Sequence, residues 1–382
     1  MTYDVEALRR EEFPWASAGE CVYLNSASTG PMPERAIRAT VEWARLRATP
    51  ERVPGELQFG TLARGRELIA RLIGAEPAEI ALATNTTFGI NLAAFALPLA
   101  TGDVVLTPDL EFPANVYPWM QLAERRGVEY RRIRCDDGVL DRDRLARELE
   151  DDRVRVVSVS WVQYASGARV DLAALGSLCR ERGVYFVVDA IQGLGPLQVD
   201  LRETPVDIFA SGAQKWLLGP WGAGFVYVRK ELVPQLEPHD VSWMAVRGSD
   251  DFTRLADYDL TWRDDARRFE FITLPYQDFA GMNASLELIH ELRPAAVSEH
   301  SLRLAEKIVS WARANDVPLA TPGTAARHAA IVSLKVPDAA AASRRLKEAH
   351  VAHSLREGGI RLAPYFFNTE DEIDRVLRML ES

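Results

Sequence analysis

A lysine near the middle of the chain has a setting that favours nucleophilic chemistry. Lys215 follows an apolar segment, residues 206–210, and is accompanied by Trp216, Leu217 and Trp221. Apolar surroundings disfavour the charged form of a lysine and lower its pKa, so the neutral amine becomes available to form a Schiff base with a carbonyl compound. A solvated lysine in a hairpin loop would share this local sequence, so the lysine alone leaves both readings open.

An aspartate and two threonines stand at the ends of other apolar segments. Asp189 ends the continuous apolar run 184–188, where a carboxylate needs a partner. Thr86 and Thr87 follow another apolar run and precede an apolar helix expected over residues 90–97. The N–H groups at a helix start bind anions such as phosphate, although the same threonines could simply cap the helix.

The segments that carry these residues alternate between strand and helix patterns. This alternation indicates right-handed βαβ units and a mostly parallel sheet, and continuous apolar strands are typical of a sheet with helices on both faces. Ligands of such sheets lie at the carboxyl ends of the strands. The residues expected at or just beyond strand ends are Asn85, Thr86, Thr87, Glu111, Phe112, Gln163, Asp189 and Lys215.

The 382-residue chain is long for a single core, so more than one domain is expected. Strand and helix alternation fills the first two thirds and includes a helix expected over residues 64–73 and a strand expected over residues 224–228. The periodicity weakens after residue 236. Further on, long helical patterns and a capping box at residues 369–372 indicate a compact α+β unit. We therefore predict an N-terminal segment (1–20), a large α/β domain (21–240), a connecting or interface segment (241–276) and a smaller C-terminal α+β domain (277–382).

Composition excludes several classes of function. The net charge of −10 argues against a nucleic-acid surface, and the longest apolar run, residues 90–100, is too short to span a membrane. The three cysteines, Cys21, Cys135 and Cys179, are scattered, which fits a reducing cytoplasm. Neither they nor the six histidines have metal-site spacing, so no metal site is expected.

An aspartate and a lysine at strand ends, with an anion site at a helix start, are the minimum apparatus for pyridoxal phosphate (PLP). In this order the motifs resemble those of fold-type-I PLP enzymes of the aminotransferase class V family, which includes cysteine desulfurases, isopenicillin N epimerase-like proteins and kynureninase. The resemblance runs from residue 23 to residue 369. It implies PLP as cofactor and a homodimer with the site at the subunit boundary.

The family resemblance gives the cofactor residues their expected roles. Lys215 would hold PLP covalently and Asp189 would hold its pyridine nitrogen. The remaining contacts implied are Gln192 near the phenolic oxygen, Gln163 at a cofactor oxygen, Phe112 stacked on the ring, and Thr86, Thr87 and Gln214 at the phosphate. Phe112 and Gln214 each stand where desulfurases often have histidine.

The resemblance also places the substrate and the partner subunit. Arg361 resembles the arginine that binds the α-carboxylate, where a bidentate fork suits a planar anion. Ala27 and Ser28 lie in the matched N-terminal loop and are expected at the substrate. Thr273, in the segment 268–273, is expected to reach the phosphate held by the partner subunit, although Ile272 replaces the glycine usual in the family.

Transamination of a small amino acid is the reaction we predict. A lyase of the desulfurase or kynureninase kind and an amino-acid epimerase remain as alternatives. A persulfide mechanism is disfavoured because residues 350–360 contain no cysteine before Arg361. From another class, a non-catalytic PLP-fold partner protein is disfavoured because Lys215, Asp189 and Arg361 are all retained. A dinucleotide-binding site is disfavoured because its glycine-rich motif must lie between a strand and a helix, whereas the glycine-rich residues 219–224 precede a strand.

Overall fold

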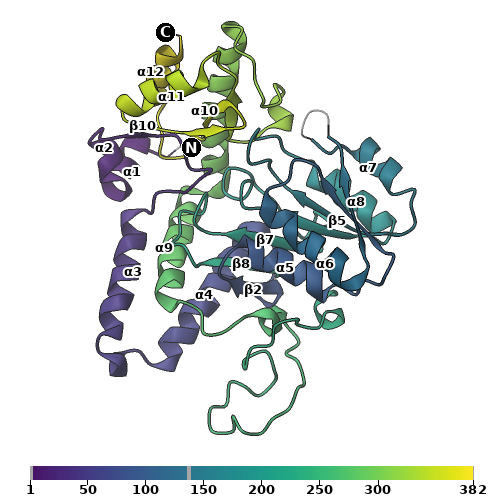
Figure 1. Cartoon of the computed structure of the whole chain (residues 1–382). Helices are drawn as coiled ribbons and strands as arrows, with labels where there is room; N and C mark the ends of the chain where they lie inside the picture. Colours follow the sequence, from purple (N-terminus) through teal and green to yellow (C-terminus); the bar gives the residue numbers. More distant parts are fainter. Residues whose placement is uncertain (1–2, 136–138, 382) are drawn as a thin grey trace.

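The computed structural model describes residues 3–135 and 139–381 (Figure 1). Its centre is a seven-stranded sheet in the order β2-β8-β7-β6-β5-β3-β4. The pairs that β8 forms with β2 and β7 are antiparallel and the other four pairs are parallel, so the sheet is mostly parallel, as the sequence predicts. The strands are β2 (Ile80–Ala83), β3 (Val104–Pro108), β4 (Glu129–Ile133), β5 (Val154–Ser160), β6 (Tyr185–Asp189), β7 (Ile208–Gly212) and β8 (Gly224–Val228).

Helices cover both faces of this sheet, which explains why its strands are continuously apolar. Phe186 and Val188 of β6 pack into one buried cluster, together with α4 (Gly55–Ile73) and α8 (Leu172–Glu181). Val187, between them, points to the other face and packs with α5 (Thr86–Ala96) and α6 (Tyr117–Arg126). The short α7 (Arg142–Glu148) precedes β5.

A second, smaller unit is built from the C-terminal part of the chain around its own core. It contains α10 (Pro294–Ala314), α11 (Ala339–Glu348), α12 (Glu370–Leu380) and an antiparallel sheet of order β11-β12-β9. The strands of that sheet are β9 (Val332–Leu334), β11 (Ser354–Arg356) and β12 (Gly359–Leu362). The helix α9 (Tyr276–Leu292) leads into this unit from the large one (Figure 1).

The N-terminal segment joins the C-terminal unit rather than the large sheet. The strand β1 (Val22–Tyr23) pairs in parallel with β10 (Val351–Ala352). Arg9 of α1 (Val5–Glu12) bonds Glu372 of α12 at 2.9 Å and the Phe367 carbonyl at 3.0 Å. The short α2 (Pro14–Ser17) follows, and α3 (Glu34–Arg47) then runs alongside α9 (Figure 1). The two ends of the chain are therefore tied together.

Two helix starts were wrongly predicted. The helix expected from residue 90 begins at Thr86, so Thr86 and Thr87 lie in its first turn and Asn85 caps it. The sequence pattern indicates a helix from residue 64, but α4 begins at Gly55. Three glycines in this stretch lower its intrinsic helix propensity, so its first turns depend on tertiary packing. Asn283 of α9 donates to the Thr61 carbonyl at 2.9 Å, and a Cβ on Gly65 would stand only 3.1 Å from the Asn283 side chain. The close packing of α9 thus stabilises the first turns of α4, which the local sequence would not stabilise by itself.

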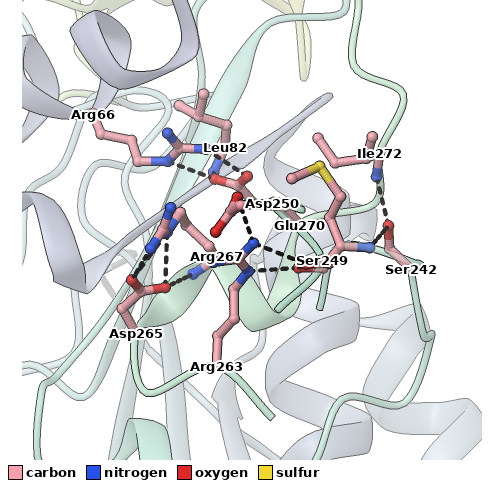
Figure 2. Close-up of polar contacts among 11 residues, drawn as sticks. Arg66, Leu82, Ser242, Ser249, Asp250, Arg263, Asp265, Arg267, Glu270 and Ile272 are labelled. Carbon is pink, nitrogen blue, oxygen red and sulfur yellow. Dashed lines mark hydrogen bonds and ion pairs between the residues drawn. The ribbon is translucent and has the colours of Figure 1, made fainter. Parts of the chain in front are cut away.

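The segment 241–276 has little regular structure, yet arginines fix parts of it (Figure 2). Arg263 donates to the Met244 carbonyl, to Ser249 and to Asp250 at 2.7–2.8 Å. Glu270 accepts from Arg66 of α4 at 2.6 and 2.8 Å. Residues 251–262, between Asp250 and Arg263, extend away from the body as a long loop (Figure 1).

None of the helices over 3–135 and 139–381 is long and apolar enough to cross a membrane. Within the same ranges, no three His, Cys, Asp or Glu side chains are grouped so that they could hold a metal ion.

Candidate active site

The predicted site residues converge where loops leave the carboxyl edge of the central sheet. Asp189 is the last residue of β6, Gln163 follows β5, and Lys215 follows β7. The loop after β1 packs directly against this edge. A Cβ on Gly30 would lie 1.9 Å from the Lys215 carbonyl oxygen, and Gly30 N–H donates to the Gln214 carbonyl at 2.8 Å. Only a glycine permits that approach.

Lys215 lies in a weakly solvated place beside an aromatic ring. Its Nζ is 5.7 Å from the centroid of Phe112, and the Phe112 ring meets Tyr164 edge-on at 5.3 Å. Burial lowers the pKa of Lys215 to about 8, and the charge of Asp189 opposes that effect. Within the described ranges, Lys215 forms no ion pair within 4 Å. The amine is therefore partly neutral at physiological pH.

Asp189 is a buried carboxylate that forms no ion pair with another of the described residues. It is 3% exposed, and its Oδ1 accepts from the Ile191 backbone at 3.0 Å. Burial raises its pKa to about 6. No lysine, arginine or histidine of the described residues lies within 4 Å of it. A carboxylate of this kind fits a protonated ring nitrogen, which would supply the missing charge.

The start of α5 forms an anion-type end of the site. Asn85 caps the helix, since its side chain accepts from Phe88 N–H at 3.0 Å. The other N–H groups at the start of a helix have no intrahelical partners. Thr86 Oγ1 accepts from Gly212 N–H at 2.9 Å, and Gln214 Oε1 is 2.2 Å from where a Cβ of Gly212 would lie. The three predicted phosphate residues Thr86, Thr87 and Gln214 thus gather here, with Thr87 exposed.

Arg361 is buried among polar groups from three segments. It is 2% exposed, and it donates to the Tyr164 carbonyl at 2.6 Å and to Ser28 Oγ at 2.7 Å. Burial, and then the charge of Arg356, lower its pKa to about 10. Its Nε is buried without a hydrogen-bond partner. An unpartnered guanidinium N–H beside Ser28 fits the carboxylate predicted for this place.

Gln192 and Ala27 hold the architecture of the site together. Gln192 Nε2 donates to the Ala27 carbonyl at 2.9 Å, and its Oε1 accepts from Trp216 Nε1 at 2.9 Å. The side chain thereby ties the loop after β1 to the residue that follows Lys215. The predicted contact of Gln192 with the cofactor stays a prediction.

The sequence placed Glu111 at a strand end but gave it no role. Its Oε1 accepts from Ser160 N–H at 2.7 Å and from Gln163 Nε2 at 3.2 Å, and its other oxygen has a short contact with Ser160 Oγ. Burial raises its pKa to about 7. Glu111 therefore orients the Gln163 amide. The signal in the sequence that could have identified Glu111 was its charge, directly before the aromatic Phe112 at a strand end.

Thr273 lies away from this cluster in a single chain. Its side chain is exposed, three residues after the anchored Glu270. Among the described residues, no hydrogen bond or ion pair links it to the groups around Lys215. The predicted role of Thr273 at a partner's phosphate needs a second copy, so it stays a prediction.

A cleft of about 720 Å³ adjoins the site. Among its lining residues, Glu111, Gln163 and Tyr164 belong to the large unit, and Thr321, Lys335 and Glu357 belong to the C-terminal unit. The cleft therefore runs between the two units. Tyr164, whose carbonyl accepts from Arg361, connects it to the site.

Three comparisons with known proteins bear on this arrangement. The family model "Aminotransferase class-V" matches residues 22–376. A probable cysteine desulfurase of Methanothermobacter thermautotrophicus is 30% identical over 292 residues, which cover 75% of this chain and 71% of the relative. The isopenicillin N epimerase of Streptomyces clavuligerus is 31% identical over 381 residues, 94% of each chain.

A solved structure shows the same fold. A variant of the cystine C–S lyase C-DES, with glycine covalently linked to its PLP cofactor, matches with a TM-score of 0.89. It is 23% identical, and the match covers 99% of both chains. The predicted α/β fold of type I is thereby confirmed.

The family match spans most of the chain, and the buried lysine, aspartate and helix start fit PLP. Both the expected family and the expected cofactor are confirmed. This chain belongs to the aminotransferase class-V family of PLP-dependent proteins.

Proposed function

We propose that this protein is a PLP-dependent lyase that removes a sulfur substituent from Cβ of an L-amino acid, with Lys215 as the base. The observation that carries the proposal is the half-buried amine of Lys215, 5.7 Å from the centroid of the Phe112 ring, whose pKa burial lowers to about 8. Transamination, our prediction from the sequence, is less well supported because relatives that match are mainly named cysteine desulfurases and epimerases.

The residues of the site divide the work of such a reaction. When bound, PLP supplies an electron sink for a carbanion at Cα. Arg361 would orient the substrate through its α-carboxylate, and Lys215, once neutral, would accept the Cα proton. Asp189 would hold the positive charge of the ring nitrogen. Phe112 offers only an apolar face, so Lys215 is also the group that would return a proton to the departing sulfur.

The released sulfur would not be held on an enzyme cysteine next to the substrate. The hairpin of β11 and β12 contains none, and residues 350–361 hold no cysteine. The Cβ–S bond would break to release sulfide from a thiol substrate, or the persulfide of the leaving thiol from a disulfide substrate. The remaining carbon skeleton would leave as a 2-oxo acid and ammonia. This separates the proposal from a desulfurase that passes sulfur to a protein acceptor.

Epimerisation is a second candidate, favoured by one observation. The epimerase of Streptomyces clavuligerus matches 94% of this chain, a longer share than the 75% matched by the desulfurase of Methanothermobacter thermautotrophicus. Both reactions begin with removal of the Cα proton by Lys215. They differ only in what leaves or returns afterwards.

The test is incubation of the PLP-loaded protein with L-cysteine, L-cystine and L-alanine, with and without a 2-oxo acid. Sulfide or persulfide, together with pyruvate, is expected from the sulfur amino acids without any acceptor. Product of inverted configuration, with no sulfur release, would favour the epimerase. Amino transfer that requires the 2-oxo acid would overturn the lyase and restore transamination.

We also propose that the protein works as a homodimer in which Thr273 of one subunit completes the phosphate site of the other. The exposed position of Thr273 and the exposed aromatic residues Trp243, Phe252 and Phe271 support a covered surface here. Light scattering of the loaded protein tests this: a monomer would contradict it. The cytoplasmic location stays a prediction.

The lowered pKa of Lys215 predicts how fast the cofactor-free protein takes up PLP at different pH values. Only the neutral amine attacks the aldehyde, so the rate should rise about tenfold per pH unit below the pKa and level off above it. With a pKa of about 8, the plateau is expected above pH 8. Stopped-flow absorbance at constant ionic strength measures this. A rate that still climbs tenfold per unit between pH 9 and 10 would contradict it.

A further inference from the structure

A second arginine lies on the same face of the C-terminal hairpin as Arg361. In the pairing of β11 with β12, Ser354 stands opposite Arg361 and Arg356 stands opposite Gly359. Alternate residues of a strand point to the same side, so Arg356 projects on the side of Ser354 and Arg361. Arg361 Nη2 and Ser354 Oγ are 3.4 Å apart on that side. Gly359 offers no side chain to cover Arg356.

Three cations therefore gather at the substrate end of the site. Arg361 and Arg356 both contribute to the lowered pKa of Lys215, after burial, and Arg356 contributes to the lowered pKa of Arg361. Like charges at such range repel one another unless an anion lies between them. The three positive charges therefore favour the binding of negatively charged ligands.

The protein itself does not neutralise Arg356. In the part of the chain that the structure describes, Arg356 forms no ion pair, and its one hydrogen bond is to the Leu355 carbonyl at 3.3 Å. The adjacent Glu357 instead directs its carboxylate to Tyr164 Oη, 3.4 Å away. The side chain of Arg356 is exposed, so a ligand in the site can reach it.

One carboxylate does not account for both arginines. The unpartnered Nε of Arg361 suits the α-carboxylate of any amino acid. Arg356 lies further along the hairpin, towards its turn, and its exposed side chain is free to meet a second group of the same ligand. We infer that the substrate carries a second carboxylate on its side chain and that Arg356 binds it. This inference rests on the proposed function, because it assumes an amino acid held by Arg361.

Binding of unreactive acids to the PLP-loaded protein tests the inference without turnover. Glutarate and butyrate differ by one carboxylate, and isothermal titration calorimetry gives the Kd of each. Glutarate is expected to bind about tenfold more tightly to the wild-type protein, the effect of one charge-assisted hydrogen bond. Arg356→Met should remove that difference and leave butyrate unchanged.

A matched variant separates local binding from net charge. Arg378→Met removes an exposed arginine from α12 and should keep the preference for glutarate. Equal affinities of glutarate and butyrate in the loaded wild-type protein would overturn the inference alone. So would an equal loss of the preference in Arg356→Met and Arg378→Met. A wild-type protein that binds no PLP would overturn the proposed function, and this inference with it.

Discussion

Replacing Lys215 by alanine is expected to abolish covalent attachment of PLP and to lower turnover by roughly 10²- to 10⁴-fold, the usual contribution of a positioned acid–base group. Lys215 is the amine beside Phe112 whose pKa burial lowers to about 8. Without it, the Cα proton has no base in this place. Absorbance of the bound cofactor and mass spectrometry after borohydride reduction measure attachment, and pyruvate release measures turnover.

Two variants guard this prediction against trivial explanations. Lys230→Ala removes an exposed lysine paired with Glu76 at 3.1 Å and should leave attachment and turnover unchanged. Lys215→Arg keeps the positive charge next to Asp189 but cannot form the covalent bond, so it should fail as alanine does. Wild-type turnover in Lys215→Ala would remove the lysine from its proposed role.

Replacing Glu270 by glutamine is expected to destabilise the folded protein by about 3–5 kcal/mol, the usual cost of breaking a buried ion pair on one side. Glu270 is 4% exposed and accepts from Arg66 and from Leu82 N–H at 2.9 Å, as Figure 2 shows. The glutamine would leave the guanidinium of Arg66, 11% exposed, without its counter-charge. A fall of several degrees in the apparent Tm of the cofactor-free protein should follow.

The same helix supplies the matched control. Arg64 and Glu287 form an ion pair at 3.0 Å, with 49% and 41% of their side chains exposed. Glu287→Gln should cost less than about 1 kcal/mol because water solvates both partners. The double variant Arg66→Met with Glu270→Met should recover much of the loss, since no buried charge then remains. Equal Tm shifts for Glu270→Gln and Glu287→Gln would contradict the role given to burial.

Periodicity in the sequence predicted the sheet well and the helix α4 poorly. The strands of the sheet are short apolar runs bounded by polar residues, so local composition identifies them. Gly224–Val228 was predicted with its true limits. The first turns of α4 contain glycines and form because α9 packs against them. The 3.6-residue periodicity of apolar residues along α4 contains no information about packing against α9, so it could not predict these turns.

The site residues likewise divide into those that the sequence could predict and those that it could not. Lys215, Asp189 and the start of α5 follow apolar strands directly, so their place at one edge of the sheet could be predicted from order along the chain. Glu111 could not, because its burial results from the side chains of Ser160 and Gln163 that close over it.

The sequence by itself determined the strand–helix alternation, the residues at the carboxyl edge of the sheet and the motifs that identify the family. Those features are local, because each depends on residues adjacent in the chain. Only the tertiary structure decided that Ser28 and Tyr164 surround Arg361, that Arg356 shares its face, and that Glu270 is buried against Arg66. These contacts join residues up to 333 positions apart, and they form only when the packing of separate cores brings their segments together.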